Sequence, residues 1–328
     1  MRVVLVSSRS FGKLIPVGKT ILSQGGFEVR HVGSEERPLD EGKMTEIVAR
    51  EDPDAVICGP EPLTAKVLEA SKTLRMVMMH GVGIDHIDLA AANRLGIVVA
   101  NAPGTTTAAV ADLTIAMMLA LQRHLCEANQ MTKAGGWERH LGHELSEMTI
   151  GVIGTGRIGV QVIKRLSGFG SRILAYDAIQ DSQLVKEYGI SYVPLQKLLK
   201  ESDVVTLHIP LVEETRQIIG RRELQQMKKT ACLINTARGE LVDEEALYEH
   251  LKANAAAGAA LDVFSVEPPR GNPLLELDNV LATPHVASYT AEATERLDRM
   301  CAETIVHTFS GKPSPNILNP EAVKARRP

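Results

Sequence analysis

The sequence has few cysteines, few aromatic residues and no long hydrophobic run. Its four cysteines among 328 residues, Cys58, Cys126, Cys232 and Cys301, include no C-x-x-C pair. This spacing argues against a disulfide framework and a cysteine-bound zinc site, and it predicts reduced thiols in the cytoplasm. The strongly apolar stretch LTIAMMLALQ, residues 113–122, is half as long as a membrane-spanning helix, and the apolar part of the N-terminal MRVVLVSSRS is too short for a secretion signal. We therefore expect neither a membrane span nor export.

The sequence also lacks a large excess of positive or negative charge. Lys and Arg number 36 against 40 Asp and Glu, which gives a formal net charge of −4. This balance gives no electrostatic reason to expect nucleic acid or an acidic membrane surface as a partner. Hydrophobic residues make up 44% of the chain, which is enough for sizeable cores, and the length predicts about two domains.

Short apolar runs alternate with amphipathic, helix-like segments along the whole chain. Because the runs are apolar throughout rather than at every second residue, they predict strands of parallel sheets that helices cover on both faces. A Pro-Gly turn before the apolar helix at 113–122 predicts a domain crossing, and residues 291–309 predict one long helix that returns to the first domain. The predicted strands are residues 3–7, 55–59, 75–79, 97–101, 149–154, 172–177, 204–209, 231–236 and 259–263.

A G-x-G-x-x-G motif follows one of these strands directly. In GVIGTGRIG, Gly154 permits a tight turn, Gly156 lets the backbone approach a pyrophosphate, and Gly159 lets strand and helix pack closely. The next predicted strand ends in Asp177, which is 177 − 154 = 23 positions after the first glycine. A carboxylate there accepts hydrogen bonds from ribose hydroxyls and repels a 2′-phosphate, and Ala178 follows it instead of an arginine. The motif therefore predicts NAD as the cofactor.

Three candidate catalytic residues each follow an apolar run. Arg238 lies in INTARG, Glu267 follows DVFSV, and His285 follows VLATP. The carboxyl ends of parallel strands form the edge where α/β sheets bind ligands. Each residue alone fits an ordinary surface loop, but together they provide an anion anchor, an orienting carboxylate and a proton donor.

Several segments in this order resemble the D-isomer-specific 2-hydroxyacid dehydrogenase family. They are HGVGIDHIDL, VVANAPG, GGWERHLGHELSEMTIGVIG, DVVTLHIPL, LINTARGELVDEEAL, AALDVFSVEPP and ATPHVAS, and they extend over essentially the whole chain. The resemblance implies a Rossmann-type doubly wound parallel sheet inserted into a smaller, discontinuous flavodoxin-like α/β substrate domain. We expect residues 102–287 to bind NAD and residues 1–101 with 288–328 to form the substrate domain.

The resemblance also implies residue roles. His285 would protonate the carbonyl oxygen of a 2-oxo acid during hydride transfer, Glu267 would hold the imidazole and raise its pKa, and Arg238 would bind the substrate carboxylate. The loop of His80, Gly81, Val82 and Gly83 would offer backbone N–H groups to the same carboxylate. The expected cofactor contacts, besides the three glycines and Asp177, are Arg157, Ile158, Ile209, Pro210, Thr215, Thr236, Ala237 and Asp262.

The substrate is predicted less sharply than the reaction. Gly59 and Met79 stand where phosphoglycerate dehydrogenases are expected to carry phosphate-binding arginines, so a small 2-oxo acid such as hydroxypyruvate or glyoxylate is favoured over 3-phosphoglycerate. Arg9 and Lys13, after the first strand, could meet a second anionic group, and Trp137 resembles a tryptophan that in some relatives reaches the neighbouring subunit's pocket.

The sequence also bears on an alternative function, on oligomeric state and on metal binding. The alternative function is an NAD(H)-sensing corepressor-like binding protein on the same fold, whereas formate dehydrogenase is disfavoured because that branch is expected to have Gln at position 267. We expect a homodimer through the nucleotide domain. We expect no metal, because His140 and His143 have no third ligand nearby in the sequence.

Overall fold

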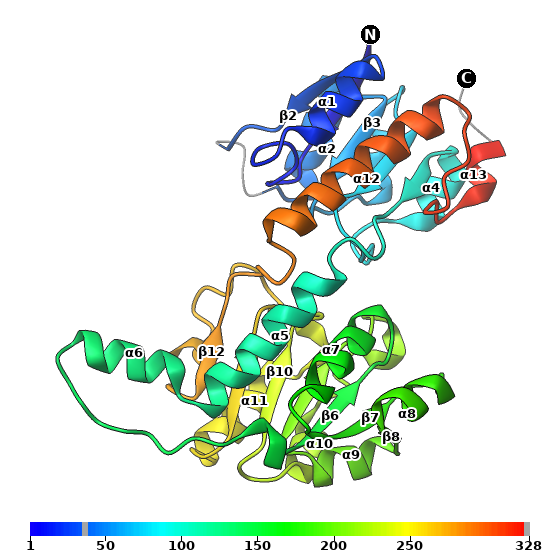
Figure 1. The fold of residues 1–328 in the computed structure, drawn as a ribbon. Coiled ribbons are helices and arrows are strands. Elements are labelled where there is room, and N and C mark those ends of the chain that lie inside the picture. Colours follow the sequence, from blue (N-terminus) through cyan, green and yellow to red (C-terminus); the bar gives the residue numbers. More distant parts are fainter. Residues whose placement is uncertain (35–38, 325–328) are drawn as a thin grey trace. The chain divides into compact units, whose positions relative to one another are not determined.

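The computed structural model describes residues 1–34 and 39–324, and the chain divides into two compact units. Unit 1 comprises Met1–Thr106 with Tyr289–Pro328, and unit 2 comprises Thr107–Ser288. Each unit has its own parallel sheet with helices on both sides of it (Figure 1). The predicted α/β fold class is confirmed.

Unit 1 contains a five-stranded parallel sheet with the strand order β2-β1-β3-β4-β5. This is the flavodoxin-like order, whose ligand-binding edge lies at the carboxyl ends of the strands where the order reverses, between β1 and β3. The strands are β1 (Arg2–Val6), β2 (Phe27–His31), β3 (Ala55–Cys58), β4 (Met76–Met79) and β5 (Val98–Ala100); the helices are α1 (Val17–Gln24), α2 (Glu41–Glu51), α3 (Ala65–Glu69), α4 (Leu89–Leu95), α12 (Ala291–Phe309) and α13 (Pro320–Lys324).

The C-terminal helix α12 is part of the core of unit 1. It starts at the predicted residue, where the hydroxyl of Thr290 accepts a hydrogen bond from the N–H of Ala293. Leu297, Cys301 and Ile305 recur at four-residue spacing and are buried in the apolar cluster that also contains β1, β3 and β4 side chains. The opposite face of the sheet is covered by α2, α3 and α4. A helix near the other end of the chain thus completes the fold of the N-terminal strands.

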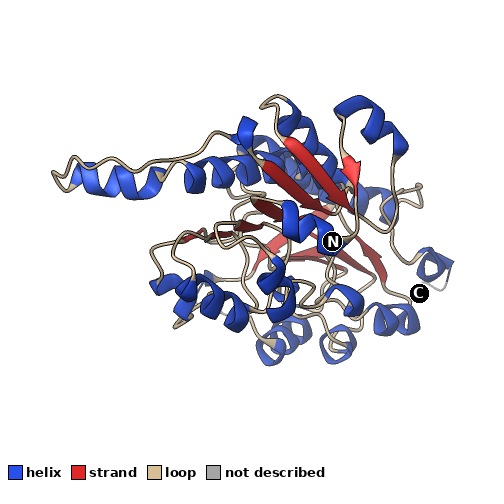
Figure 2. Ribbon diagram, turned by 90° about the horizontal axis from the view of Figure 1, so that it is seen from below, coloured by secondary structure: helices blue, strands red, loops and turns tan. Residues whose placement is uncertain are grey.

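Unit 2 contains a seven-stranded parallel sheet with the order β12-β11-β10-β9-β6-β7-β8. Helices lie on both faces of it, as Figure 2 shows by colour. The strands are β6 (Thr149–Ile153), β7 (Arg172–Tyr176), β8 (Ser191–Tyr192), β9 (Val204–Leu207), β10 (Cys232–Asn235), β11 (Gly258–Leu261) and β12 (Val280–Ala282); the helices are α5 (Thr107–Gln122), α6 (Leu125–Lys133), α7 (Arg157–Ser167), α8 (Ser182–Tyr188), α9 (Leu195–Glu201), α10 (Arg221–Gln226) and α11 (Glu244–Ala253).

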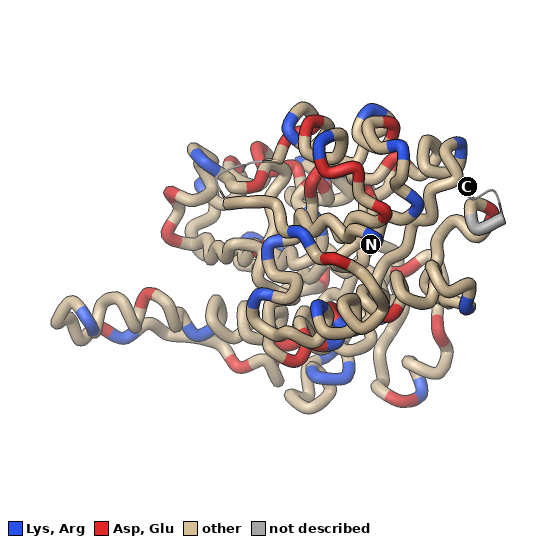
Figure 3. The backbone as a smooth tube through the Cα atoms, turned by 90° about the horizontal axis from the view of Figure 1, so that it is seen from above, with Lys and Arg blue, Asp and Glu red and all other residues tan. Residues whose placement is uncertain are grey.

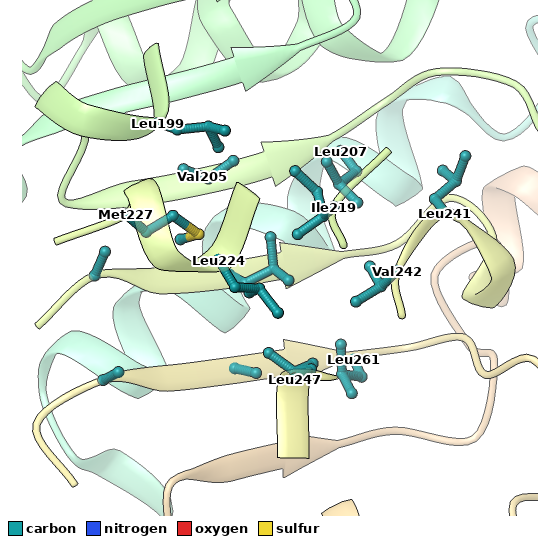
Figure 4. Close-up of a cluster of buried hydrophobic side chains, with 14 of the residues drawn as sticks. Leu199, Val205, Leu207, Ile219, Leu224, Met227, Leu241, Val242, Leu247 and Leu261 are labelled. Carbon is teal, nitrogen blue, oxygen red and sulfur yellow. The ribbon is translucent and has the colours of Figure 1, made fainter. Parts of the chain in front are cut away.

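Apolar side chains fill both faces of the sheet of unit 2. Figure 4 shows one of the two clusters, in which Leu207 of β9 lies beside Ile219, and Leu247 of α11 lies beside Leu261 of β11. The other cluster joins α5 and α7 to the opposite face. Burial on both faces is the reason why the central strands of this sheet are mostly apolar rather than alternately apolar and polar.

The sequence predicted nine strands correctly and missed β2, β8 and β12. All three are edge strands. β2 has the partly polar sequence FEVRH, β8 has two residues, and β12 has three residues that are all partly exposed. An edge strand needs less apolar surface than a central one, so a search for continuous apolar runs does not detect it.

Basic and acidic residues are mixed along the chain, as the near-balanced composition requires (Figure 3). Within the described ranges no single helix is long and apolar enough to cross a membrane. The helices α5 and α6, which meet at a bend, are long and apolar enough only when they are taken together.

Candidate active site

The G-x-G-x-x-G motif forms the turn between β6 and α7. Gly154 has a φ of 96°, which favours glycine, and a Cβ placed there would lie 2.5 Å from the carbonyl oxygen of His208. The position in front of Gly156 is open, with no atom within 4 Å of a Cβ built on it. Helix α7 begins at Arg157 without a side-chain cap, so the N–H groups of Arg157 and Ile158 in its first turn are available to an anion. This turn fits a pyrophosphate.

Asp177 follows β7 and lies against the same turn. Its Oδ2 accepts hydrogen bonds from the N–H of Thr155 at 2.6 Å and from the hydroxyl of Thr155 at 3.1 Å, and its Oδ1 accepts one from the N–H of Ile179 at 2.9 Å. Burial alone would raise the pKa of Asp177, but the N–H groups of Ile179 and Thr155 and the Thr155 hydroxyl hold it below the usual value. The carboxylate is therefore ionised and points at the glycine turn.

The other predicted cofactor residues lie in loops after β9 and β10. Ile209 is half-buried, and Pro210 and Thr215 belong to one turn, in which the Thr215 hydroxyl donates to the Pro210 carbonyl at 2.7 Å. Thr236 is buried, with its hydroxyl 3.0 Å from that of Thr114, and Ala237 is half-buried. Both loops start at the carboxyl ends of adjacent strands, as does the glycine turn.

His285 and Glu267 form a hydrogen-bonded pair. The Nδ1 of His285 lies 2.8 Å from the Oε2 of Glu267, and the two side chains are 44% and 33% exposed. The hydrogen bond to Glu267 raises the pKa of His285 against the effect of burial. Burial would raise the pKa of Glu267, but the hydrogen bond and charge of His285, the N–H of Phe264 and the charge of Arg238 together lower it. The Nε2 of His285 has no hydrogen-bond partner in the described parts of the chain.

Asp262 fixes the loop that carries His285. It is fully buried, and its Oδ1 accepts from the Thr283 hydroxyl at 2.5 Å and from the N–H of Val286 at 2.8 Å, while its Oδ2 accepts from the N–H of Ala287 at 2.8 Å. The N–H of His285 donates to the Asp262 carbonyl, and His285 has a φ of 52°. The Asp262 side chain, which follows β11, therefore holds the loop after β12 and keeps the strained backbone of His285 in place.

Arg238 lies in the loop after β10, half-buried. The side chain of Asn235 closes this loop, because its Oδ1 accepts from the N–H of Ala237 at 3.0 Å and its Nδ2 donates to the carbonyl of Arg238 at 2.7 Å. One guanidinium nitrogen of Arg238 donates to the Ala237 carbonyl at 2.7 Å. Unit 2 thus brings Arg238, Glu267 and His285 to the carboxyl edge of one sheet, and the charge of Arg238 acts on both members of the His285–Glu267 pair.

The predicted substrate loop of unit 1 follows β4. The N–H of His80 donates to the Cys58 carbonyl at 2.8 Å, so His80 itself offers no backbone donor, which corrects that part of the prediction. The N–H groups of Gly81, Val82 and Gly83 donate to no residue within 1–34 and 39–324. The carbonyls of Gly81 and Val82 are held by the N–H of Ala102 and the side chain of Asn101. Three adjacent donors are therefore free on a fixed loop.

The side chain of His80 is buried between two other segments of unit 1. Its Nδ1 lies 2.9 Å from the Ser8 hydroxyl, and its Nε2 lies 2.7 Å from the Oδ1 of Asp298 on α12. The Oδ2 of Asp298 accepts from the N–H of Gly12 at 2.8 Å. These contacts tie the loop after β1, the loop after β4 and α12 to one another.

Sequence reasoning missed Asn235, Ser8, Asp298, Thr155 and Tyr192. Asn235 stands inside the quoted segment LINTARGELVDEEAL, but nothing in its spacing shows that it closes the loop. Ser8 and Asp298 lie 72 and 218 positions from His80, so only the folded chain shows their contact with it.

A seven-stranded parallel sheet, a glycine turn that fits a pyrophosphate and a histidine–carboxylate pair at the same edge define an NAD-dependent dehydrogenase. The family model described as "D-isomer specific 2-hydroxyacid dehydrogenase, NAD binding domain" matches residues 115–287, which lie within unit 2. The chain belongs to this family.

The similar known proteins carry the names of different dehydrogenases and reductases. A glyoxylate reductase of Korarchaeum cryptofilum is 45% identical over 82% of this chain and 83% of its own length. A D-3-phosphoglycerate dehydrogenase of Methanocaldococcus jannaschii is 44% identical over 78% of this chain and 50% of its own length. The crystal structure of a D-lactate dehydrogenase from Aquifex aeolicus, complexed with NAD and lactic acid, is 31% identical, with a TM-score of 0.83 over 99% of this chain and 98% of that one.

Family membership confirms three predictions. The protein is an oxidoreductase that acts on CH–OH groups, its cofactor is NAD, and its reaction is that of an NAD-dependent D-2-hydroxyacid dehydrogenase. The relatives give no support to the corepressor-like alternative.

Proposed function

We propose that the protein reduces a small 2-oxo acid, glyoxylate or hydroxypyruvate, with His285 as the proton donor. The observation that carries the proposal is the His285–Glu267 pair, which is half-exposed at the carboxyl edge of the NAD-binding sheet and has a raised histidine pKa. A general acid has to be protonated near neutral pH and accessible to substrate, and this pair combines both properties.

The residues of unit 2 divide the chemistry between them. When bound, the nicotinamide supplies the hydride that C2 of the substrate receives. The imidazolium of His285 donates its free Nε2 proton to the carbonyl oxygen, while Glu267 stays ionised and holds Nδ1. The guanidinium of Arg238 binds the substrate carboxylate as a planar fork. In the oxidative direction, neutral His285 takes the proton back from the hydroxyl.

The cofactor contacts are part of the same proposal. The open space at Gly156 and the first turn of α7, at Arg157 and Ile158, would hold the pyrophosphate, and Asp177 would accept the adenosine ribose hydroxyls. The loops after β9 and β10, with Ile209, Pro210, Thr215, Thr236 and Ala237, would border the rest of the dinucleotide. We assign unit 2 to the cofactor and unit 1 to the substrate, with the free N–H groups of Gly81, Val82 and Gly83 as carboxylate donors.

The substrate is small because the positions that would bind a distal phosphate do not carry positive charge. Met79 packs on Gly81, where an added Cβ would lie 2.9 Å from the Met79 Cε. The N–H of Gly59 donates to the buried carboxylate of Glu61 at 2.7 Å. A negative charge at this edge of the sheet opposes a second anionic group nearby, and the similarity to glyoxylate reductases supports the same choice.

A substrate panel tests the proposal. NADH oxidation is followed with glyoxylate, hydroxypyruvate, pyruvate and phosphohydroxypyruvate, with NADPH as a parallel control. We expect the highest kcat/KM with glyoxylate or hydroxypyruvate and NADH. A clear preference for phosphohydroxypyruvate would contradict the small substrate, and Arg9→Ala would then test whether Arg9, which is exposed in the loop after β1, binds the second anion.

We further propose that the protein is a cytoplasmic homodimer. Helix α6 has no buried residue, and together with residues 134–144 it forms an arm that projects from the sheet of unit 2 (Figures 1 and 2). The arm exposes 61% of Leu125, 81% of Trp137 and 91% of Leu141, and such apolar exposure supports contact with a second copy. The four free cysteines support a reducing compartment.

Sedimentation of the wild type and of a Trp137→Ala, Leu141→Ser double variant tests the dimer. We expect a dimer for the wild type and a weakened dimer for the variant. A wild-type monomer at micromolar concentration would contradict the proposal.

A further inference from the structure

A chain of hydrogen bonds runs along the end of the glycine turn in unit 2. The hydroxyl of Tyr192 donates to the Oγ1 of Thr155 at 2.9 Å, and the hydroxyl of Thr155 donates to the Oδ2 of Asp177 at 3.1 Å. Tyr192 belongs to the edge strand β8 and pairs with Ala175 of β7, two residues before Asp177. The network therefore joins the turn after β6 to the ends of two neighbouring strands.

The direction of these hydrogen bonds is fixed at both ends. The N–H of Asp181 donates to the Tyr192 hydroxyl at 3.2 Å, which leaves the Tyr192 proton to point toward Thr155. The Thr155 oxygen accepts that proton and turns its own proton toward Asp177, which is ionised and accepts hydrogen bonds only. Each bond thus orients the next, which strengthens the chain.

The hydrogen bonds that the Asp177 carboxylate already accepts show which of its oxygen atoms is left for a ligand. Its Oδ2 already receives two hydrogen bonds from Thr155, and its Oδ1 receives one from the N–H of Ile179. A carboxylate has about four acceptor positions, and the N–H of Ala178 also acts on this carboxylate, so the atom that Thr155 leaves for a ligand is Oδ1. A ribose hydroxyl can donate to it, whereas a 2′-phosphate would meet a carboxylate whose neighbouring N–H groups are already used.

We propose that Thr155 and Tyr192 are specificity-determining residues that position the Asp177 carboxylate for a nucleotide with a free 2′-hydroxyl. The inference rests on the proposed assignment of Asp177 to the adenosine ribose. Neither residue touches the reacting atoms. Their effect is on the affinity for NADH relative to NADPH and not on the chemical step.

The test measures dissociation constants of NADH and NADPH by fluorescence titration of Tyr192→Phe, Thr155→Val and Thr155→Ser. Loss of one hydrogen bond of ordinary strength predicts that Tyr192→Phe and Thr155→Val weaken NADH binding about three- to tenfold. We expect little change for NADPH, so that the discrimination between the two falls. Thr155→Ser keeps the hydroxyl and should retain wild-type affinity.

Two controls separate the possible failures. Tyr188→Phe removes a hydroxyl that interacts with Glu187, the preceding residue of helix α8, and it should leave both constants unchanged. Asp177→Asn tests the proposed ribose contact itself. If Asp177→Asn weakens NADH binding but Tyr192→Phe and Thr155→Val do not, the positioning role is wrong while the ribose site stands. If Asp177→Asn also binds NADH normally, the ribose assignment fails as well.

The kcat at saturating NADH distinguishes positioning from general damage to the fold. An unchanged kcat and melting temperature together with a raised Kd for NADH support the inference. A fall in kcat and stability with an unchanged ratio of the two dissociation constants would overturn it.

Discussion

Each unit contains a histidine–carboxylate pair next to the carboxyl edge of its parallel sheet, and the two hydrogen bonds have nearly the same length. His285 and Glu267 in unit 2 are 2.8 Å apart, and His80 and Asp298 in unit 1 are 2.7 Å apart. The side chains of the first pair are 44% and 33% exposed, whereas those of the second are 3% and 0% exposed. The pairs therefore have nearly the same hydrogen-bond length but differ strongly in access to solvent, and they use different ring nitrogens, Nδ1 in His285 and Nε2 in His80.

This difference separates a proton donor from a structural contact. Among the described residues, none bonds the Nε2 of His285, while both ring nitrogens of His80 are occupied, one by Ser8 and one by Asp298. A histidine can serve as a general acid only when a substrate atom can approach one of its nitrogens. A short hydrogen bond to a carboxylate is thus insufficient evidence for catalysis.

Replacement of His285 should have the largest effect. We expect His285→Gln to lower kcat by about two to four orders of magnitude, the usual range for a general acid–base group, while NADH still binds. Steady-state kinetics and NADH titration together measure both quantities. Turnover close to the wild-type value would remove His285 from its proposed role.

Replacement of His80 should affect folding instead. Removing one partner of a buried pair leaves Asp298 poorly compensated, and we expect His80→Ala to lower the free energy of unfolding by about 3 to 5 kcal/mol, measured in urea. The matched variant is His285→Ala. Because its pair is exposed, it should cost no more than about 1 kcal/mol. Equal losses in the two variants would remove the distinction between the pairs.

Arg238 should affect substrate binding more than cofactor binding. We expect Arg238→Gln to reduce kcat/KM for the 2-oxo acid about a hundredfold, since a charge-assisted bidentate contact of roughly 3 kcal/mol is lost. The Kd for NADH should stay the same. Arg157→Gln, at the start of α7, is the contrasting variant, since its expected effect is on the Kd for NADH.

Glu267 should change the pH dependence of the reaction. The hydrogen bond that His285 donates to Glu267 raises the pKa of His285, so protonated His285, which reduction requires, persists to higher pH in the wild type. His285 contributes fully to stability at pH values below the unfolded-state pKa of histidine. This contribution is lost as the pH rises through the raised pKa that His285 has in the folded protein. Glu267 has a lowered pKa, so its own contribution is lost as the pH falls through that value. The pair is therefore strongest between the two folded-state pKa values.

The sequence predicted the catalytic residues of unit 2 but not the buried pair of unit 1. His285, Glu267 and Arg238 each follow an apolar strand, and their positions at one sheet edge follow from the parallel topology. The His80–Asp298 pair could not be predicted, because a contact between β4 and α12 depends on how a helix 218 residues away packs. The same limit applies to Tyr192, since β8 is a two-residue edge strand without an apolar pattern.

The pH profile of kcat/KM for 2-oxo acid reduction, measured for the wild type and Glu267→Gln, tests the central claim most directly. We predict that the loss of activity with rising pH occurs at lower pH in Glu267→Gln, because neutral glutamine no longer stabilises the imidazolium of His285. The same profile in Ser8→Ala should coincide with that of the wild type. A profile that shifts in Ser8→Ala and stays in place in Glu267→Gln would contradict the assignment of His285 as the proton donor.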